Sequence, residues 1–345
     1  MMVGAERPVQ AVVVGAGLMG RWHADAAIRA GATVTAVVDR DRARADHLAR
    51  RLHGARAHTE LSAVLGTTGV RVIHICTDLE SHLTLAREAL SAGCNVLIEK
   101  PLAPDSAGLE EILALADSNG LLVCPVHQFL FQRGILALGK SGEAVGTIRH
   151  FEMEVASTGA ESGTLGRDAA ALEILPHGLA LAARLCGTGI ALADWSLQRA
   201  TEGEISVGTV FGQTRIGIRI SMQGRPPVNR LRLVTDSGTV EADLFNGFSV
   251  WDRTASSRVM KLFRPIRSAA VLGGVAVANL VARTLRSETA YPGLRELVRR
   301  FYSASLGDES TPIGNEESRA VTAAWTSIRQ LLDAPTRKSN IQYPS

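Results

Sequence analysis

Three glycines near the start of the chain stand where a short apolar strand would turn into a helix. In the run A-V-V-V-G-A-G-L-M-G, Gly15, Gly17 and Gly20 have the spacing G-x-G-x-x-G. The first glycine of this pattern makes a tight turn, the second lets the backbone approach a pyrophosphate, and the third lets the helix pack on the strand. The N–H groups of Leu18 and Met19 would open the helix and bind phosphate. The pattern predicts a dinucleotide site.

An acidic residue supports this prediction. Asp39 ends the second apolar run, 33–38, and an acid about 20 residues past the glycines is expected to bind the ribose hydroxyls. A carboxylate there accepts hydrogen bonds from a ribose diol and repels a 2′-phosphate, which favours NAD. Arg40 follows directly and could stack over the adenine or grip a 2′-phosphate, so NADP stays open.

A lysine at the end of a later strand could act on a substrate. The triplet Glu99-Lys100-Pro101 follows the apolar run 95–98. An ammonium at the carboxyl edge of a sheet can bind a substrate oxygen and stabilise a developing alkoxide. Glu99 could orient the lysine or contact the ribose, and the Lys100–Pro101 bond is a candidate cis peptide. The alternative is a surface charge pair before a helix.

These motifs together resemble the glucose-fructose oxidoreductase / inositol dehydrogenase (Gfo/Idh/MocA) family. The similarity includes the glycine motif, the acid at 39, the pair Cys76-Thr77 followed by His82, and the Glu-Lys-Pro triplet. It is dense in the first third of the chain and thin beyond. It implies a nicotinamide cofactor lined by Cys76 and Thr77, with His82 packed beside the nicotinamide loop.

The resemblance also points to a histidine on a helix of the second domain. Family members carry an acid four residues before it, and Glu173 and His177 have this spacing. The family usually has aspartate and a small residue where this chain has Glu173 and Pro176. The helix therefore either begins at about Leu175, with Pro176 in its first turn, or kinks there. A first-turn start would favour a neutral His177 through the helix dipole. The alternative is a satisfied core histidine.

Several further residues are expected near the substrate. His127 and Gln128 follow the last strand of the first domain and are substrate-binding candidates. Phe129–Phe131 replaces an Arg-Phe pair common in relatives and favours a less polar substrate. The apolar stretch Ala269–Ala282 is expected to be a covering helix, or else a dimer interface or a lip over an apolar substrate.

The composition restricts the class of protein. The 37 basic and 34 acidic residues are interleaved, and aromatic residues are few, which argues against nucleic-acid binding. No set of residues has metal-ligand spacing. The four cysteines form no C-x-x-C pair, and no signal peptide or membrane span is recognised. We expect a cytoplasmic protein with reduced thiols.

Alternating strands and helices fill the first third of the chain, which predicts an α/β, doubly wound Rossmann domain over 1–126. Short strands joined by tight turns follow, and they predict an α+β domain over 127–334 with an open, largely antiparallel sheet backed by helices. Residues 335–345 would be a tail. The uncovered sheet face would support a homodimer or homotetramer.

The sequence thus predicts an NAD(P)-dependent oxidoreductase. Hydride would pass between the nicotinamide and a secondary alcohol or ketone carbon of a small sugar-like or natural-product substrate. The resemblance implies that Lys100 polarises the oxygen, His177 transfers the proton, and Glu173 orients His177 or the substrate. Two alternatives remain: a cofactor-binding regulator without redox turnover, and a relative that reduces imines or performs redox-neutral chemistry.

Overall fold

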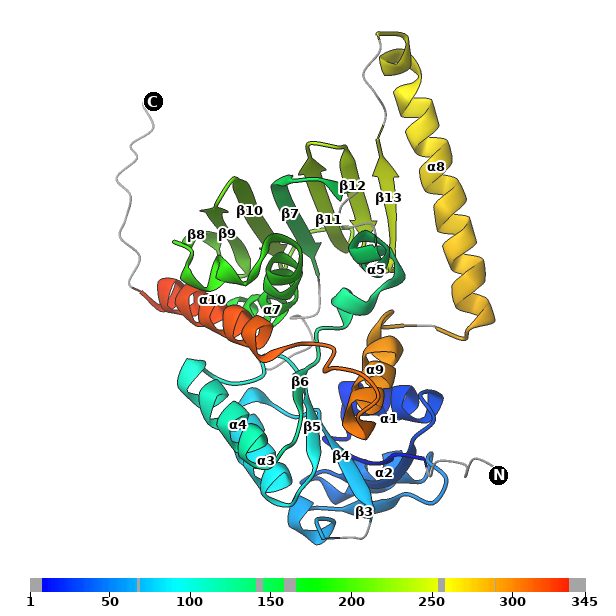
Figure 1. Ribbon diagram of the computed structural model, residues 1–345, viewed down its shortest axis with the longest axis vertical. Helices are drawn as coiled ribbons and strands as arrows, with labels where there is room; N and C mark the ends of the chain where they lie inside the picture. The colour runs from blue at the N-terminus through cyan, green and yellow to red at the C-terminus, as the bar shows by residue number, and fades with distance from the viewer. Residues whose placement is uncertain are drawn as a thin grey trace.

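Two β-sheets organise the chain along its long axis (Figure 1). The computed structural model describes residues 8–66, 69–140, 145–157, 166–253, 258–288 and 290–334. Within these ranges the first sheet has six strands and the second has seven. The tail expected over 335–345 lies outside the described residues.

The first sheet is parallel throughout, in the order β3-β2-β1-β4-β5-β6. This confirms the predicted Rossmann topology; only β3, three residues long, had no apolar run to reveal it. The strands are β1 (Gln10–Val14), β2 (Thr33–Val38), β3 (Arg56–His58), β4 (Val70–Ile75), β5 (Asn95–Ile98) and β6 (Val123–Pro125). The helices between them are α1 (Leu18–Arg29), α2 (Arg42–Ala49), the short η1 (Leu61–Ala63), α3 (Leu79–Ser91) and α4 (Ser106–Ser118).

The central strands of this sheet are mostly apolar and buried because helices cover both faces. Every residue of β5 is buried, and β1 is buried from its second residue onward. Parallel strands end at one edge of the sheet. Gly15, Asp39, Cys76 and Glu99 each follow the last residue of a strand, so the sequence motifs meet at that edge.

The second sheet is mixed, in the order β13-β12-β11-β7-β10-β9-β8. Its pairings are antiparallel except for β7 with β10, which run parallel. The strands are β7 (Ile148–Ala156), β8 (Ser196–Thr201), β9 (Glu204–Phe211), β10 (Thr214–Ser221), β11 (Val228–Thr235), β12 (Thr239–Asp243) and β13 (Phe248–Asp252). Buried and exposed residues alternate along β9 to β12, as expected for a sheet with one covered face.

Helices pack on the covered face and link the two sheets (Figure 1). The segments outside the first sheet are η2 (Gln128–Phe131), α5 (Arg133–Lys140), α7 (Arg167–Cys186), η4 (Thr188–Leu192), α8 (Arg258–Leu285), α9 (Leu294–Leu306) and α10 (Asn315–Asp333). α7 lies against the second sheet, α10 packs on both α7 and α4, and α9 packs on α1.

The helix expected over Ala269–Ala282 is present, as part of α8, but it does not cover the core. None of its apolar window Leu262–Leu285 is buried. α8 runs beside the edge strand β13 and extends away from the body (Figure 1). The expectation of a covering helix was wrong because apolar composition does not reveal whether a helix faces a core or the outside.

Replacing Gly178 with alanine tests the packing of α7 on the second sheet. A Cβ there would lie 2.9 Å from both Ile218 Cδ1 and Met153 Sδ. Overpacking of this kind costs about 1 to 3 kcal/mol, and the gain in helix propensity offsets about 1 kcal/mol of it. We expect urea unfolding to give a lower free energy of unfolding for G178A. In G273A, on α8, the new methyl meets nothing within 4 Å, so equal destabilisation there would contradict this account.

Candidate active site

In the glycine turn after β1, neighbouring backbone atoms leave no room for a side chain at two positions. Gly15 has φ of +93°, and a Cβ there would lie 2.4 Å from the carbonyl oxygen of Cys76. At Gly20 a Cβ would lie 1.8 Å from the Gly15 carbonyl oxygen. The turn is therefore pressed against both its own helix and the end of β4, as a dinucleotide-binding turn requires.

A cavity of about 840 Å³ lies along the carboxyl edge of the first sheet. Gly17, Asp39, Arg40 and Thr77 are among the residues that line it. Gly17 caps α1 without a side-chain hydrogen bond, and the first turn of α1 has no acidic residue. The orphan N–H groups at this end suit a phosphate, so the residues present fit a dinucleotide.

Asp39 and Arg40 stand at the adenosine end expected for this cavity. The Asp39 carboxylate accepts hydrogen bonds from the N–H groups of Ala16 (2.7 Å) and Asp41 (2.9 Å). These bonds fix the carboxylate beside the glycine turn. Arg40 reaches toward Asp78, with 3.6 Å between Nη2 and the carboxylate oxygen, and both side chains are exposed. The arginine is thus turned toward the end of β4.

The segment after β4 contributes Cys76, Thr77 and His82. Cys76 and Thr77 line the cavity, and burial, together with the charge of Glu99, raises the pKa of the Cys76 thiol. His82 is fully buried, with Nδ1 at 2.9 Å from the Pro101 carbonyl oxygen and Nε2 at 3.0 Å from that of Thr77. Through these two contacts, His82 connects the loop that follows β4 to the loop that follows β5.

Lys100 connects the edge of the first sheet to α7. It follows β5 directly after Glu99, and the Lys100–Pro101 peptide is cis, as expected. Its Nζ donates a hydrogen bond of 3.0 Å to the main-chain carbonyl of Glu173. An ammonium has three donors, so this bond orients the cation and leaves N–H groups for another oxygen.

Pro176 lies inside α7, which begins at Arg167 and continues to Cys186. Of the two expected alternatives, the helix start at about Leu175 is therefore wrong. Proline cannot donate to the carbonyl four residues earlier, and here the Nε1–H of Trp325 on α10 donates to that carbonyl, of Leu172, at 2.9 Å. The indole satisfies the oxygen that proline leaves without a donor, so the helix continues through position 176.

His177 is buried on α7, and its imidazole is held neutral. Its pKa lies well below the ordinary value because of burial first, and then because of the charge of Lys100 and the proximity of His127. The expected helix-dipole effect does not apply, since His177 lies in the middle of α7. The Phe129 ring packs on the imidazole with 4.5 Å between centroids. His177 Nδ1 has no hydrogen-bond partner among the described residues.

His127 and Gln128 lie at the start of η2, the short helix that packs on α7. The His127 and His177 rings meet edge to face, with centroids 6.2 Å apart. Burial lowers the pKa of His127 to about 3. Within the described residues, His127 Nδ1 and Gln128 Oε1 are buried without hydrogen-bond partners. Lys100 lies close enough to His127 and His177 for its charge to lower the pKa of both imidazoles.

One of two sequence expectations near this site needs revision. The Glu173 side chain is exposed, and it is the main-chain carbonyl of this residue that contacts Lys100. Leu130 and Phe131 are buried in the core, and Phe131 lies under the guanidinium groups of Arg184 and Arg300. These two side chains pack inside the protein, and Phe129 is the residue of this segment that contacts His177; the expectation of a less polar substrate stays a prediction.

A buried chain of hydrogen bonds that the sequence did not reveal ends at Glu99. Glu99 Oε1 lies 3.0 Å from His23 Nε2, the Nδ1 atoms of His23 and His74 are 3.0 Å apart, and His74 Nε2 lies 2.7 Å from the Tyr302 hydroxyl. With both imidazoles neutral, each polar hydrogen has an acceptor: Tyr302 donates to His74, His74 to His23, and His23 to Glu99.

This chain keeps Glu99 ionised next to Lys100. Burial raises the pKa of Glu99, but the hydrogen bond from His23, the charge of Lys100 and the hydrogen bond from the Lys100 N–H outweigh it, so the pKa lies below its ordinary value. The residues come from α1, β4, β5 and α9. The signal that could have found them is the presence of lone histidines, His23 and His74, in otherwise apolar buried elements.

The fold and the edge cavity define a Rossmann-type dinucleotide-binding domain joined to a mixed sheet. Residues 9–127 match the family described as "Oxidoreductase family, NAD-binding Rossmann fold". This match covers the part of the chain whose motifs resemble the Gfo/Idh/MocA family, and it agrees with the predicted family and nicotinamide dinucleotide cofactor.

Curated relatives align over the same region. The uncharacterized oxidoreductase YhhX of Escherichia coli K12 is 39% identical over 100 residues, covering 27% of this chain and 29% of its own length. The inositol 2-dehydrogenase of Corynebacterium glutamicum (strain R) is 36% identical over 141 residues, covering 38% of this chain and 41% of its own length. The alignment thus spans less than half of each relative.

Solved structures extend the similarity of fold to the whole chain. The WlbA dehydrogenase from Bordetella pertussis, solved in complex with NADH and UDP-GlcNAcA, has a TM-score of 0.75 at 16% identity, covering 94% of this chain and 97% of its own. The second sheet and its helices therefore have the architecture of a known two-sheet dehydrogenase.

Acidification is expected to destabilise the fold through the buried histidines. The pKa values of His74, His127 and His177 are all lowered, mainly by burial. The unfolded chain therefore binds more protons than the folded chain below pH about 6.5, and stability falls as the pH falls, by about 2 kcal/mol per histidine between pH 7 and 5.

Urea unfolding at pH 7, 6 and 5 measures this slope. The H127Q variant should show a shallower dependence on pH than the parent, because one buried titrating group is gone. H47Q is the matched control, since His47 is exposed and should leave the slope unchanged. A parent protein with equal stability at pH 7 and 5 would refute the assignment. The lowered pKa of Glu99 also makes stability depend on pH, but only at pH values below its unfolded pKa of about 4.5.

Proposed function

We propose that this protein is an NAD(P)-dependent oxidoreductase that interconverts a secondary alcohol and a ketone on a small polyhydroxylated molecule. The observation that carries the proposal is the position of the Lys100 ammonium. It is hydrogen-bonded to the Glu173 carbonyl, follows the strand edge that bears the glycine turn, and lies near enough to His177 for its charge to lower the pKa of that imidazole.

The glycine turn, the open end of α1 and Asp39 would hold the dinucleotide. The uncapped N–H groups after Gly17 suit the pyrophosphate, and the fixed carboxylate of Asp39 suits the ribose diol. When bound, the nicotinamide ring supplies or accepts the hydride. Thr77 and Cys76 form the wall of the same cavity.

Lys100 binds and polarises the substrate oxygen. The Glu173 carbonyl engages one of its N–H groups, and the others are free to donate to an oxygen on which negative charge develops. A carbonyl partner orients the ammonium without neutralising it. Glu99, held ionised by His23, adds a fixed negative charge at the adjacent position.

His177 transfers the proton. A neutral imidazole accepts a proton from an alcohol in the oxidative direction, and the imidazolium returns it to an alkoxide in the reductive direction. Burial and the charge of Lys100 favour the neutral form, which prepares His177 as a base. Phe129 fixes the plane of the ring.

The orphaned polar atoms favour a substrate with several hydroxyl groups. His127 Nδ1, Gln128 Oε1 and His177 Nδ1 are buried without partners in the described chain, and leaving such atoms unpaired costs about 1 to 3 kcal/mol each. Hydroxyl groups of a sugar-like molecule or a cyclitol could donate to Gln128 Oε1. They could donate to the two imidazole nitrogens or accept from them, according to the tautomer. The dehydrogenases similar to this chain include an inositol 2-dehydrogenase, which is consistent with such a substrate.

Substitution of the two reacting side chains tests the mechanism. K100M should lower kcat by at least about 100-fold, because the alkoxide loses its stabilising cation. H177N should lower kcat by about 100-fold through the loss of proton transfer. The assay follows NAD(P)H absorbance with a panel of cyclitols, sugars and their ketones.

E173Q is the matched control for this experiment. It changes the exposed carboxylate and keeps the main-chain carbonyl that binds Lys100, so kcat should stay close to that of the parent. Parent-like turnover in both K100M and H177N would overturn the proposed chemistry. Tight cofactor binding with no hydride exchange on any panel compound would instead favour a regulatory protein.

Cofactor choice gives a second prediction for the same site. The Asp39 carboxylate is fixed by two backbone N–H groups and would repel a 2′-phosphate, so the protein should bind NAD more tightly than NADP. D39N removes the charge, and we expect the ratio of the two Kd values to fall by about ten-fold, or 1.4 kcal/mol.

Isothermal calorimetry with both cofactors measures this ratio. D46N is the control, because Asp46 carries the same charge on α2 but pairs with Arg42. An unchanged ratio in D39N would assign the discrimination to another residue, and Arg40 is then the first to test.

A further inference from the structure

The outward side of α8 is an apolar surface on which no described part of the chain packs. Two described helices have the length and mean hydropathy of a membrane span: α7, with 56% of its window buried, and Leu262–Leu285 of α8, with none buried. Along α8, six large apolar side chains are between 53% and 74% exposed. These are Leu262, Phe263, Ile266, Val277, Leu280 and Val281, called here the outer face.

The polar side of α8 faces the body of the protein. Arg264 Nε donates to Asp252 at 2.9 Å, Asn279 Nδ2 donates to the Asn246 carbonyl at 3.0 Å, and Arg283 Nε donates to the Glu288 carbonyl at 3.1 Å. With about 3.6 residues per turn, positions 264, 279 and 283 share one side of the helix. Leu262, Ile266, Val277 and Val281 fall on the opposite side.

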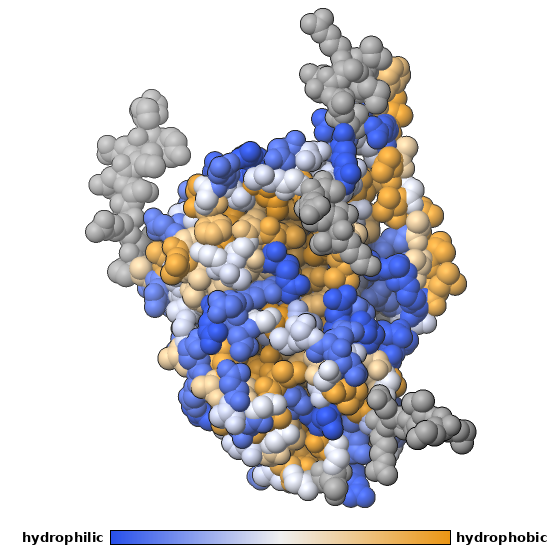
Figure 2. Space-filling view, viewed as in Figure 1, coloured by the Kyte–Doolittle hydropathy of each residue, from blue (hydrophilic) through white to orange (hydrophobic). Residues whose placement is uncertain are grey.

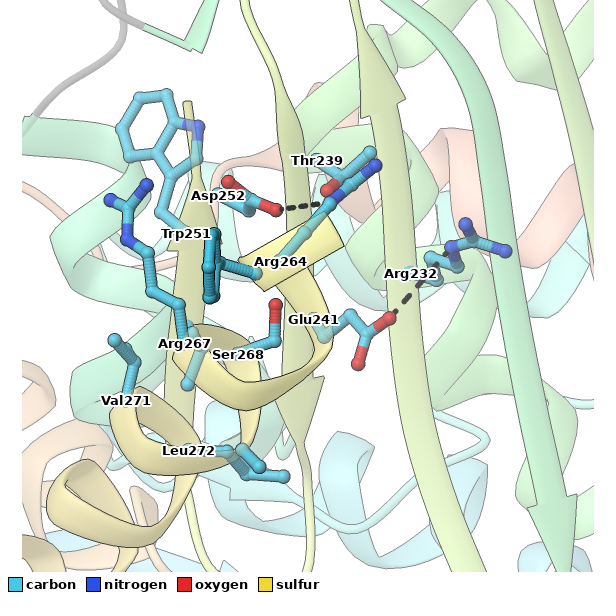
Figure 3. Close-up of a pocket in the computed structure, with 13 residues that line it drawn as sticks. Arg232, Thr239, Glu241, Trp251, Asp252, Arg264, Arg267, Ser268, Val271 and Leu272 are labelled. Atoms are coloured by element: carbon cyan, nitrogen blue, oxygen red, sulfur yellow. Dashed lines mark hydrogen bonds and ion pairs between the residues drawn. The ribbon is translucent and has the colours of Figure 1, made fainter. Parts of the chain in front are cut away.

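A cavity of about 240 Å³ separates the N-terminal half of α8 from the outer surface of the second sheet. Figure 3 shows Arg264 directed at Asp252 and a second pair, Arg232 and Glu241, on the sheet below. Arg264 of α8 is thus turned toward the second sheet. In Figure 2 the outer edge of α8 forms a hydrophobic strip along the side of the molecule. An apolar strip of this length on a protein surface indicates an interaction site.

Charge identifies the kind of partner. α8 contains five cationic residues, Arg258, Lys261, Arg264, Arg267 and Arg283, and no Asp or Glu. An apolar helix face flanked by cations is the pattern that binds anionic lipid interfaces.

A second feature beside α8 has the same charge preference. A cavity of about 630 Å³ near its C-terminal half is lined by Asn279 of α8 and by Arg133, Arg286 and Arg295. In the described part of the chain, these three exposed arginines form no ion pair. The acidic groups of this cavity are engaged: Glu296 pairs with Arg299 and Arg300, and Glu288 accepts the Gly293 N–H. The cavity therefore suits a phosphate headgroup.

We propose that the outer face of α8 docks this protein on an anionic lipid bilayer. The helix lies in the interface: its apolar side enters the boundary of the acyl region, and Arg133, Arg286 and Arg295 meet lipid phosphates. It does not cross the bilayer, because its polar side is hydrogen-bonded to the second sheet and its connecting loops. Anionic lipids attract cationic side chains near a bilayer surface, so binding depends on anionic lipid.

Vesicle sedimentation of the full chain tests the proposal. The protein should pellet with vesicles of equal parts phosphatidylcholine and phosphatidylglycerol, and much less with phosphatidylcholine alone. I266D and V277D should each lower the partition coefficient by at least about ten-fold. L192D is the matched control, since Leu192 is an exposed apolar residue on η4, away from α8, and should bind like the parent.

The arginines are tested separately. The R286Q/R295Q double variant should lose most of the preference for phosphatidylglycerol, whereas R51Q, an exposed arginine on the first domain, should keep it. Unchanged thermal unfolding of each variant shows that the fold is intact.

Three results would overturn the proposal. The first is absence of pelleting with the mixed vesicles at low salt. The second is equal loss of binding in L192D and V277D. The third is a lipid-free dimer, seen by light scattering, that I266D dissociates, because α8 would then be a subunit interface.

Discussion

The hydrogen bond from the Lys100 ammonium to the Glu173 carbonyl is the interaction on which the site depends. A cation at the edge of a sheet needs a partner that orients it, and a carboxylate partner would neutralise it. A main-chain carbonyl orients the ammonium and leaves its charge available for an oxygen that becomes negative. Because Lys100 follows β5 and Glu173 lies on α7, the same bond fixes the first sheet against the helix that carries His177.

The parts of this arrangement that follow from local sequence were predictable. The glycine turn, the acid after β2 and the lysine after β5 each lie at the end of an apolar run, and parallel topology brings strand ends to one edge. The Rossmann domain and the strand-rich second part followed from the same periodicity. The parallel pairing of β7 with β10 was not predictable. The apolar pattern of a strand is the same whether its neighbour runs parallel or antiparallel to it.

The rest depends on partners distant in sequence. Nothing near Pro176 shows that Trp325 will donate to the Leu172 carbonyl, yet that bond lets α7 continue through a proline and places His177 in mid-helix. Likewise, His23 and His74 have no recognisable spacing, and Tyr302, which ends their chain, lies on α9. Burial on α8 was misjudged for a related reason: composition gives the hydrophobicity of a face but not what it contacts.

Burial of His177 and His127 affects the chemistry of the site in two ways. It removes the charged form of His177 and His127, so the site holds a neutral base beside a fixed cation. It also leaves their Nδ1 atoms without a hydrogen-bond partner among the described residues. A ligand that supplies hydrogen bonds to these atoms recovers the free energy that burial removed. An apolar ligand would leave them unpaired, so in the proposed mechanism the same burial that prepares His177 as a base also favours a polar substrate.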